Sequence, residues 1–287
     1  SPTRQRRLST MPEPTIVPGV LPKREVVGVG ITLGTFEQHL DAIVTLARAR
    51  TSSYVCCVNA HMAVEVSSDR AFAQVVNGAD LATADGVPLL RALQKLGRTT
   101  QERVAGNDLL PALFARAAEH RLPVFLYGGR PEVLAVIQEK AAIEFPHLRF
   151  AGAHSPPFRA LTSQELVADA DRINASGAAI VMVSLGCPKQ ERWMASMRPG
   201  VQAVMLGLGG AFLLYAGIDT RAPKWMRELS LEWAYRLVLE PRRLWKRYLV
   251  TNTLFLGLVA RYGWQRLKAL PVLTVPARGP SLASSRP

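Results

Sequence analysis

The stretch PVFLYGGRPEVLAVIQEKAAIEFPHLRFAGA (Pro123–Ala153) contains the pattern that decides the fold. It begins with the apolar run PVFLYG, continues through a helix-like segment from Pro131 to Glu144, and ends with a second run, LRFAGA. Runs with few polar positions are typical of parallel strands that are covered on both faces. A strand, a helix and a further strand therefore predict a unit of parallel α/β structure.

The same alternation extends through most of the chain in both directions. The other candidate strands are Val26–Leu33, Tyr54–Val58, Ala79–Ala84, Ala179–Gly186 and Val201–Gly207. The other candidate helices are Thr35–Ala49, Ala63–Asn77, Asp108–His120, Ser163–Ala175 and Pro188–Met197. Residues 26–218 are thus predicted to form a doubly wound, Rossmann-like α/β domain, and its ligands are expected at the carboxyl ends of the strands.

Charge is distributed unevenly along the chain, which has a formal net charge of +13. Residues 27–220 carry seventeen basic and seventeen acidic side chains, whereas residues 221–268 carry eleven basic and three acidic ones. This second segment also holds four of the five tryptophans. A basic segment rich in aromatic residues suits an anionic membrane surface at least as well as a nucleic acid, and composition alone leaves both partners open.

The ends of the chain differ from the body. We expect a disordered basic tail over 1–25, a helical basic and aromatic appendage over 219–270 that Pro241 divides, and a second disordered tail over 271–287. The longest apolar stretch, Leu249–Ala260, is too short to span a bilayer. We see no secretory signal. The three cysteines form no framework, so reduced thiols are the simpler interpretation.

Polar residues follow several of the predicted strands. Asn59 follows the strand Tyr54–Val58, and Asp85 follows Ala79–Ala84. A carboxylate at a strand end can take a proton from an acceptor hydroxyl as a general base. Asp85 is equally compatible with capping the helix that contains Pro88, and Asn59 alone is compatible with a turn.

Three further segments carry candidate ligand contacts. Arg103 can clamp a phosphate through paired donors, although a surface arginine before a turn is commoner. Gly128 and Gly129 can bring backbone N–H groups close to a phosphate, or simply form a tight turn. Lys189 and Gln190 follow Pro188, which suits a first helical position and turns them toward the strand ends. Lys189 is also compatible with solvated charge.

No metal site is predicted. Asp169 and Asp171 form a DxD pattern, but they lie within a polar helix, where we expect a solvated face. The five histidines lack the spacing of metal ligands, and no cofactor is expected.

Nine segments in order resemble the WecB/TagA/CpsF group, glycosyltransferase family 26, between about Val27 and Tyr248. They are NAHM (Asn59–Met62), ADGVPL (Ala84–Leu89), RVAGND (Arg103–Asp108), FLYGG (Phe125–Gly129), PPF (Pro156–Phe158), LGCPKQE (Leu185–Glu191), GLGGAF (Gly207–Phe212), AGIDTRAPKW (Ala216–Trp225) and EPRRLWKRY (Glu240–Tyr248).

The resemblance implies an inverting, metal-independent transfer from a UDP-sugar to a polyprenyl-diphosphate-linked sugar, in bacterial surface or exopolysaccharide synthesis. It implies a peripheral enzyme on the cytoplasmic face of the inner membrane, with the appendage on the anionic membrane surface. Possible assembly into a homo-oligomer is left open. The matched residues are Asp85 as catalytic base, Asn59, Arg103 and Gln190 in the pocket, and Arg236, Arg243 and Arg247 on the donor diphosphate.

Two positions depart from the family pattern: Cys57 replaces a usual threonine, and Leu213 replaces a frequent aspartate. The donor therefore stays open between N-acetylmannosamine, its uronic acid and a neutral hexose such as glucose. Two other classes are weighed beside the transferase. One is an NAD-dependent nucleotide-sugar oxidoreductase, against which the strand-turn GVGITLGTF lacks the expected third glycine. The other is a basic nucleic-acid-binding protein.

Overall fold

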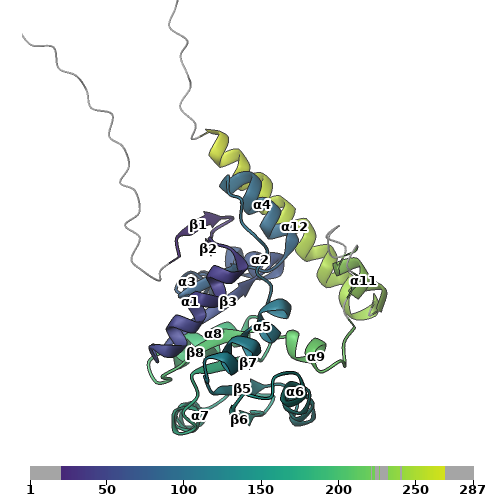
Figure 1. The fold of residues 1–287 in the computed structure, drawn as a ribbon. Coiled ribbons are helices and arrows are strands. Elements are labelled where there is room, and N and C mark those ends of the chain that lie inside the picture. Colours follow the sequence, from purple (N-terminus) through teal and green to yellow (C-terminus); the bar gives the residue numbers. More distant parts are fainter. Residues whose placement is uncertain (1–20, 221, 224–225, 227–231, 240, 269–287) are drawn as a thin grey trace, which may run out of the picture.

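The computed structural model describes residues 21–220, 222–223, 226, 232–239 and 241–268, and side chains within the last two ranges only in part. Its centre is a six-stranded sheet in the order β4-β3-β8-β7-β5-β6, in which every pairing is parallel. The fold is the Rossmann-like α/β architecture predicted from the sequence (Figure 1). The strands are β3 (Ser53–Val58), β4 (Leu81–Ala84), β5 (Val124–Gly128), β6 (Phe150–His154), β7 (Ile180–Ser184) and β8 (Val204–Gly207).

Helices cover both faces of the sheet. One apolar core lies under α1 (Phe36–Arg48), α5 (Gly106–Glu119), α6 (Pro131–Glu144) and α9 (Ala211–Tyr215). The other lies under α2 (Ala60–Ser68), α3 (Arg70–Asn77), α4 (Val87–Gly97), α7 (Ser163–Ala175) and α8 (Lys189–Met197). The chain continues through α11 (Glu232–Leu239) and α12 (Pro241–Lys268).

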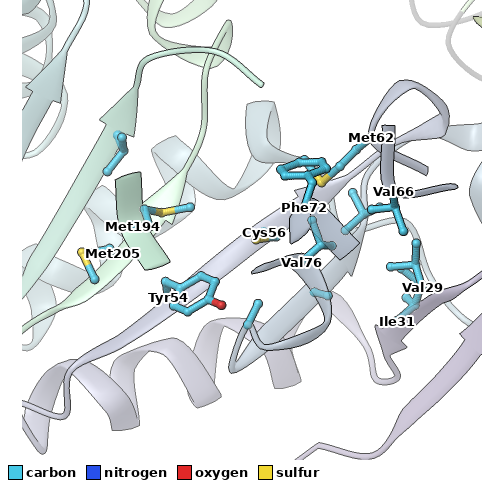
Figure 2. Close-up of a cluster of buried hydrophobic side chains, with 14 of the residues drawn as sticks. Val29, Ile31, Tyr54, Cys56, Met62, Val66, Phe72, Val76, Met194 and Met205 are labelled. Carbon is cyan, nitrogen blue, oxygen red and sulfur yellow. The ribbon is translucent and has the colours of Figure 1, made fainter. Parts of the chain in front are cut away.

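Strand β3 shows how the sequence builds both cores. All six of its residues are buried, which explains the unbroken apolar run. Tyr54 and Cys56 belong to the core beneath α2 and α3, while Val55 and Cys57 belong to the core beneath α1 and α5, because successive side chains point to opposite faces. Figure 2 shows Tyr54 and Cys56 in the first of these cores, together with Met62 from α2.

The first predicted strand, Val26–Leu33, is wrong as a single element. The chain instead forms an antiparallel hairpin of β1 (Lys23–Val26) and β2 (Val29–Thr32), separate from the main sheet. The turn residues Val27 and Gly28 have φ values of 46° and 84°. Positive φ at both central positions is the geometry of a tight hairpin turn, and a valine there gives little sequence signal.

The predicted helix Ala63–Asn77 is likewise two helices. Asp69 ends α2, since its backbone N–H donates to the Glu65 carbonyl oxygen at 3.0 Å. The same residue begins α3, because its carboxylate accepts from the Phe72 backbone N–H at 2.9 Å. One aspartate thus acts as the last cap of one helix and the first cap of the next.

Helix α12 begins at Pro241, the residue expected to divide the C-terminal segment, and it packs against the body (Figure 1). Phe255 is buried in the same core as α2, with 4% of its surface exposed. Farther along, the Tyr262 hydroxyl donates to the Glu25 carbonyl oxygen of β1 at 2.7 Å. None of the helices in the described ranges is both long and apolar enough to cross a membrane.

Candidate active site

The carboxyl ends of the strands form one row. Val58 of β3 pairs with Ala84 of β4, and Cys56 pairs with Gly207 of β8. On the other side, Gly128 of β5 pairs with Ser184 of β7. The residues that follow these pairs are therefore neighbours along one edge of the sheet, although they are far apart in the sequence. This edge is where ligands bind in open parallel α/β sheets.

Asp85 and Arg103 lie together at one end of this row. The Arg103 Nε donates to the Asp85 backbone oxygen at 2.6 Å, and an Arg103 terminal nitrogen lies 3.7 Å from a carboxylate oxygen of Asp85. About a fifth of each side chain is exposed, 23% for Asp85 and 21% for Arg103. Helix α4 is capped by Gly86 without a side-chain bond, so Asp85 does not serve as the helix cap.

The position of Asp85 is fixed by backbone bonds on both sides. Its N–H donates to the Val58 carbonyl oxygen at 2.9 Å, and the Val104 N–H donates to the Ala84 oxygen at 3.0 Å. The segment that carries Arg103 therefore runs alongside β4 as if to extend the sheet. This arrangement holds a carboxylate and a guanidinium side by side at the strand ends.

Asn59 lies beside this pair. Its side-chain oxygen accepts from the Met62 N–H at 3.1 Å, so Asn59 is the N-cap of α2. A Cβ atom at Gly86 would lie 3.2 Å from the Asn59 Cβ, which shows how closely the loops after β3 and β4 approach. The expected Asn59 and Asp85 positions are thus neighbours in the fold.

The glycine pair after β5 forms a tight turn at the middle of the row. Gly128 and Gly129 have φ values of 90° and 78°, which side chains rarely allow. A Cβ atom at Gly128 would lie 2.5 Å from the Ser184 backbone oxygen, so only glycine fits against β7. The Ser155 hydroxyl donates to the Gly129 oxygen at 2.6 Å and joins the loop after β6 to this turn.

The two candidate ligand-binding residues after β7, Lys189 and Gln190, differ in their exposure to solvent. Helix α8 begins at Lys189 with Pro188 as its N-cap, and Lys189 is exposed. Gln190 is buried, with 5% of its surface exposed, and lies against Gly207 and Gly209. Its side chain is therefore packed behind the glycine turn that follows β8, whereas Lys189 faces solvent.

Glu191 is a buried carboxylate that sequence reasoning did not single out. Its surface is 0% exposed, and its carboxylate accepts from the Gln190 side-chain amide at 2.8 Å. Burial raises the pKa of Glu191, while the Gln190 bond opposes that shift. The sequence LGCPKQE gives no signal of this burial, because a glutamate in the first turn of a helix is usually exposed.

The expected solvated face at Asp169 is wrong. Asp169 has 4% of its surface exposed and accepts a hydrogen bond from the buried Tyr127 hydroxyl at 2.5 Å. Arg172 donates to its other oxygen at 2.7 Å, and the His154 Nε2 lies 3.4 Å away. The side chain points inward because β5 supplies a buried hydroxyl that needs an acceptor. Asp171 of the same DxD pattern is exposed.

Cys57, the first departure from the family pattern, is buried beneath the row of strand ends. Burial raises the pKa of its thiol, and the Thr83 hydroxyl is its polar neighbour. Leu213, the second departure, is partly buried on α9. Arg236, Arg243 and Arg247 belong to α11 and α12, but their side chains fall outside the described part of the chain.

The comparison with protein families completes this description. A model of the glycosyl transferase WecG/TagA/CpsF family matches residues 24–269. The chain belongs to the WecG/TagA/CpsF family. The match includes the whole parallel sheet and both C-terminal helices.

Membership of the WecG/TagA/CpsF family makes the chain an enzyme that transfers sugar. It also implies a nucleotide-sugar donor and an acceptor, in synthesis of the cell envelope. The NAD-dependent oxidoreductase and the nucleic-acid-binding protein are therefore set aside in favour of the transferase. The edge that carries Asp85, Arg103, Asn59 and the glycine turns is the part of this transferase where the chemistry is expected.

Proposed function

We propose that this WecG/TagA/CpsF enzyme transfers a hexose from a UDP-sugar to a polyprenyl-diphosphate-linked sugar, with inversion and without a metal ion. The observation that carries the proposal is the Asp85–Arg103 pair at the carboxyl edge, next to Asn59. Asp85 is held at the strand end by backbone bonds, and 23% of its side chain is exposed at the edge where ligands bind in such sheets.

In this mechanism Asp85 is the general base. It takes the proton from the acceptor hydroxyl as that oxygen forms a bond to the anomeric carbon of the donor sugar. The bond from the anomeric carbon to the phosphate oxygen breaks with inversion, and UDP leaves with the electron pair. Arg103 supplies a positive charge beside the reacting groups.

The diphosphate of the donor fits the turn after β5. Gly128 and Gly129 have no side chains to block a phosphate, and they lead into the N-terminus of α6. Backbone N–H groups at a helix N-terminus attract anions. Lys189, exposed at the start of α8 after β7, would add a second positive charge on this side of the row of strand ends. We assign Arg236, Arg243 and Arg247 to the same diphosphate on the family pattern alone.

The membrane part of the proposal rests on α12. Its sequence contains seven basic residues and no acidic one. One face of the helix is packed on the body through Thr251 and Phe255, while apolar side chains on its other sides remain exposed. These exposed side chains are Val250, Leu254, Leu256 and Trp264, with 56%, 50%, 67% and 63% of their surfaces accessible. An apolar surface on a basic helix suits the headgroup layer of an anionic leaflet, as on the cytoplasmic face of the bacterial inner membrane.

A screen of UDP-sugars against a short-chain polyprenyl-diphosphate-sugar acceptor, with UDP release as the readout, tests the proposal. We expect one UDP-sugar to give acceptor-dependent release. Asp85→Asn should lower turnover by about 10²–10⁴-fold, since it removes the base, while UDP binding is retained. A folded Asp85→Asn enzyme with turnover near that of the wild type would refute the assignment of the base.

A matched control distinguishes chemistry from local charge. Asp80→Asn alters an aspartate at the opposite end of β4, where the carboxylate bonds the Tyr54 N–H and Arg198. This variant should lose some stability but keep turnover per folded molecule. If both variants lose turnover equally, the loss reflects damage to β4 and not the absence of a base.

A further inference from the structure

Gln190 and Glu191 form a buried polar pair behind the glycine turn that follows β8. The two residues are 5% and 0% exposed, and glutamate is seldom buried to this extent without a specific partner. The pair lies in the first turn of α8, after the short connection that follows β7. Both residues are therefore held by regular secondary structure beside the row of strand ends.

The contact between them determines which way the Gln190 amide faces. The Gln190 Nε2 lies 2.8 Å from Oε1 of Glu191. A carboxylate oxygen accepts hydrogen bonds, so the NH₂ group and not the carbonyl of the amide must face Glu191. The assignment of oxygen and nitrogen in this glutamine follows from its neighbour.

The carbonyl oxygen of Gln190 is consequently turned the other way. It is buried and has no hydrogen-bond partner among the described residues. A buried acceptor left without a hydrogen bond destabilises the folded protein, so it is an unusual feature to retain. The amide group lies beside Gly209, where a Cβ atom would be 3.4 Å from this oxygen.

Two glycines, Gly207 at the end of β8 and Gly209 in the turn after it, allow the Gln190 side chain to lie this close to the backbone. A Cβ atom at Gly207 would lie 3.0 Å from the Gln190 Nε2, and Gly209 has a φ of 50°. The Ser184 hydroxyl donates to the Gly209 oxygen at 2.9 Å and fixes the turn from the side of β7. Backbone without side chains is thus what lies next to the unpartnered oxygen, at the edge where ligand is expected.

We propose that Glu191 is a positioning residue that holds Gln190 as a hydrogen-bond acceptor toward the nucleotide-sugar. This inference rests on the proposed function and adds to it the polarity of one contact. The ligand group that meets Gln190 is a donor, either the ring N–H of the base or a hydroxyl of the sugar. Binding satisfies the unpartnered oxygen through a small shift of the Gly209 turn.

Variants of the two side chains test whether Gln190 is a hydrogen-bond acceptor for the ligand. In Glu191→Gln, residue 191 can both donate and accept, so the Gln190 amide is no longer fixed. We expect affinity for the nucleotide ligand to fall about tenfold, the value of one ordinary hydrogen bond, while the urea midpoint stays the same or rises. The double variant Gln190→Glu with Glu191→Gln places a carboxylate at position 190, held by the amide of residue 191. This carboxylate is again a hydrogen-bond acceptor for the ligand, so the double variant should recover most of the affinity.

Titration calorimetry with two probes distinguishes the possible donors. A loss on UDP alone assigns the donor to the base, whereas a loss confined to the UDP-sugar that the wild type turns over assigns it to the sugar. If Glu191→Gln binds both probes as the wild type does, or if the double variant recovers nothing, the proposal is refuted. A merely structural role for Glu191 predicts lower stability and no recovery by the double variant.

A second measurement does not depend on any nucleotide. The side-chain amide protons of Gln190 should exchange slowly in the ¹⁵N spectrum of the wild type and faster in Glu191→Gln. Rapid exchange in the wild type would refute the positioning role. A wild-type enzyme that binds neither UDP nor any UDP-sugar would count against the proposed function, and the exchange measurement would still decide whether Glu191 holds the amide.

Discussion

Replacement of Asp169 by alanine distinguishes a buried structural carboxylate from a metal ligand. The Asp169 side chain is 6% exposed and accepts from Tyr127 at 2.5 Å and from Arg172 at 2.7 Å. Asp171 belongs to the same DxD pattern but is exposed, so Asp171→Ala is a control on the same helix. A structural role predicts a large loss of stability at Asp169 and almost none at Asp171.

The size of that loss follows from the partners. The Tyr127 hydroxyl is fully buried and would be left without an acceptor, at a cost of about 1–3 kcal/mol. Arg172 is 47% exposed and can turn to water, so its lost ion pair contributes about 0–1 kcal/mol. Together these give a decrease of roughly 1–4 kcal/mol in the free energy of unfolding. A surface change such as Asp171→Ala should stay within about 0.5 kcal/mol.

Urea unfolding followed by circular dichroism and tryptophan fluorescence measures both variants. Tyr127→Phe completes a double-mutant cycle, and its coupling with Asp169→Ala should be about 1 kcal/mol if the two side chains share one hydrogen bond. A loss below about 1 kcal/mol at Asp169, or a rise in wild-type stability on adding Mg²⁺ or Mn²⁺ that this variant lacks, would contradict the structural assignment.

Three further outcomes are expected. Leu256→Glu together with Trp264→Glu should weaken binding to vesicles that contain phosphatidylglycerol, whereas Ile143→Glu, which is 82% exposed on α6, should not; equal losses would exclude α12 as the docking surface. EDTA should leave transfer unchanged, and inhibition that Mg²⁺ or Mn²⁺ restores would show that the reaction needs a metal. Burial raises the pKa of Glu191 above 4.5, so the native state holds this proton to higher pH than the unfolded chain does, and stability falls as pH rises above that value. Glu191→Gln should remove this fall when the free energy of unfolding is measured against pH. Identical pH profiles for the variant and the wild type would refute the contribution of Glu191.

The main sheet could be predicted because its strands are buried on both faces. In β3 and β7 the apolar runs are nearly unbroken, and their alternation with helical segments favours parallel strands covered on both faces. The hairpin of β1 and β2 could not be predicted, because its turn contains a valine with positive φ and its first strand is mostly exposed. Local strain of this kind is set by tertiary contacts and leaves little trace in composition.

The candidate site was also predictable only in part. Residues at strand ends, such as Asn59 and Asp85, could be found from strand positions, since parallel strands bring their carboxyl ends together. The pairing of Asp85 with Arg103 could not, because it depends on how the chain after α4 returns alongside β4. The burial of Asp169 could not be predicted, because the polar sequence of its helix does not reveal that the Tyr127 hydroxyl on β5 needs an acceptor.

The hydrogen bond from Tyr262 to the Glu25 oxygen has a consequence for how the protein is made. A chain emerging from the ribosome releases β1 and α2 before α12, which packs against α2 and follows the whole parallel sheet in the chain. Domains generally begin to fold from the N-terminal side during synthesis. The face of α2 that α12 contacts therefore stays uncovered until α12 has been made, and the Tyr262 bond to β1 can form only then.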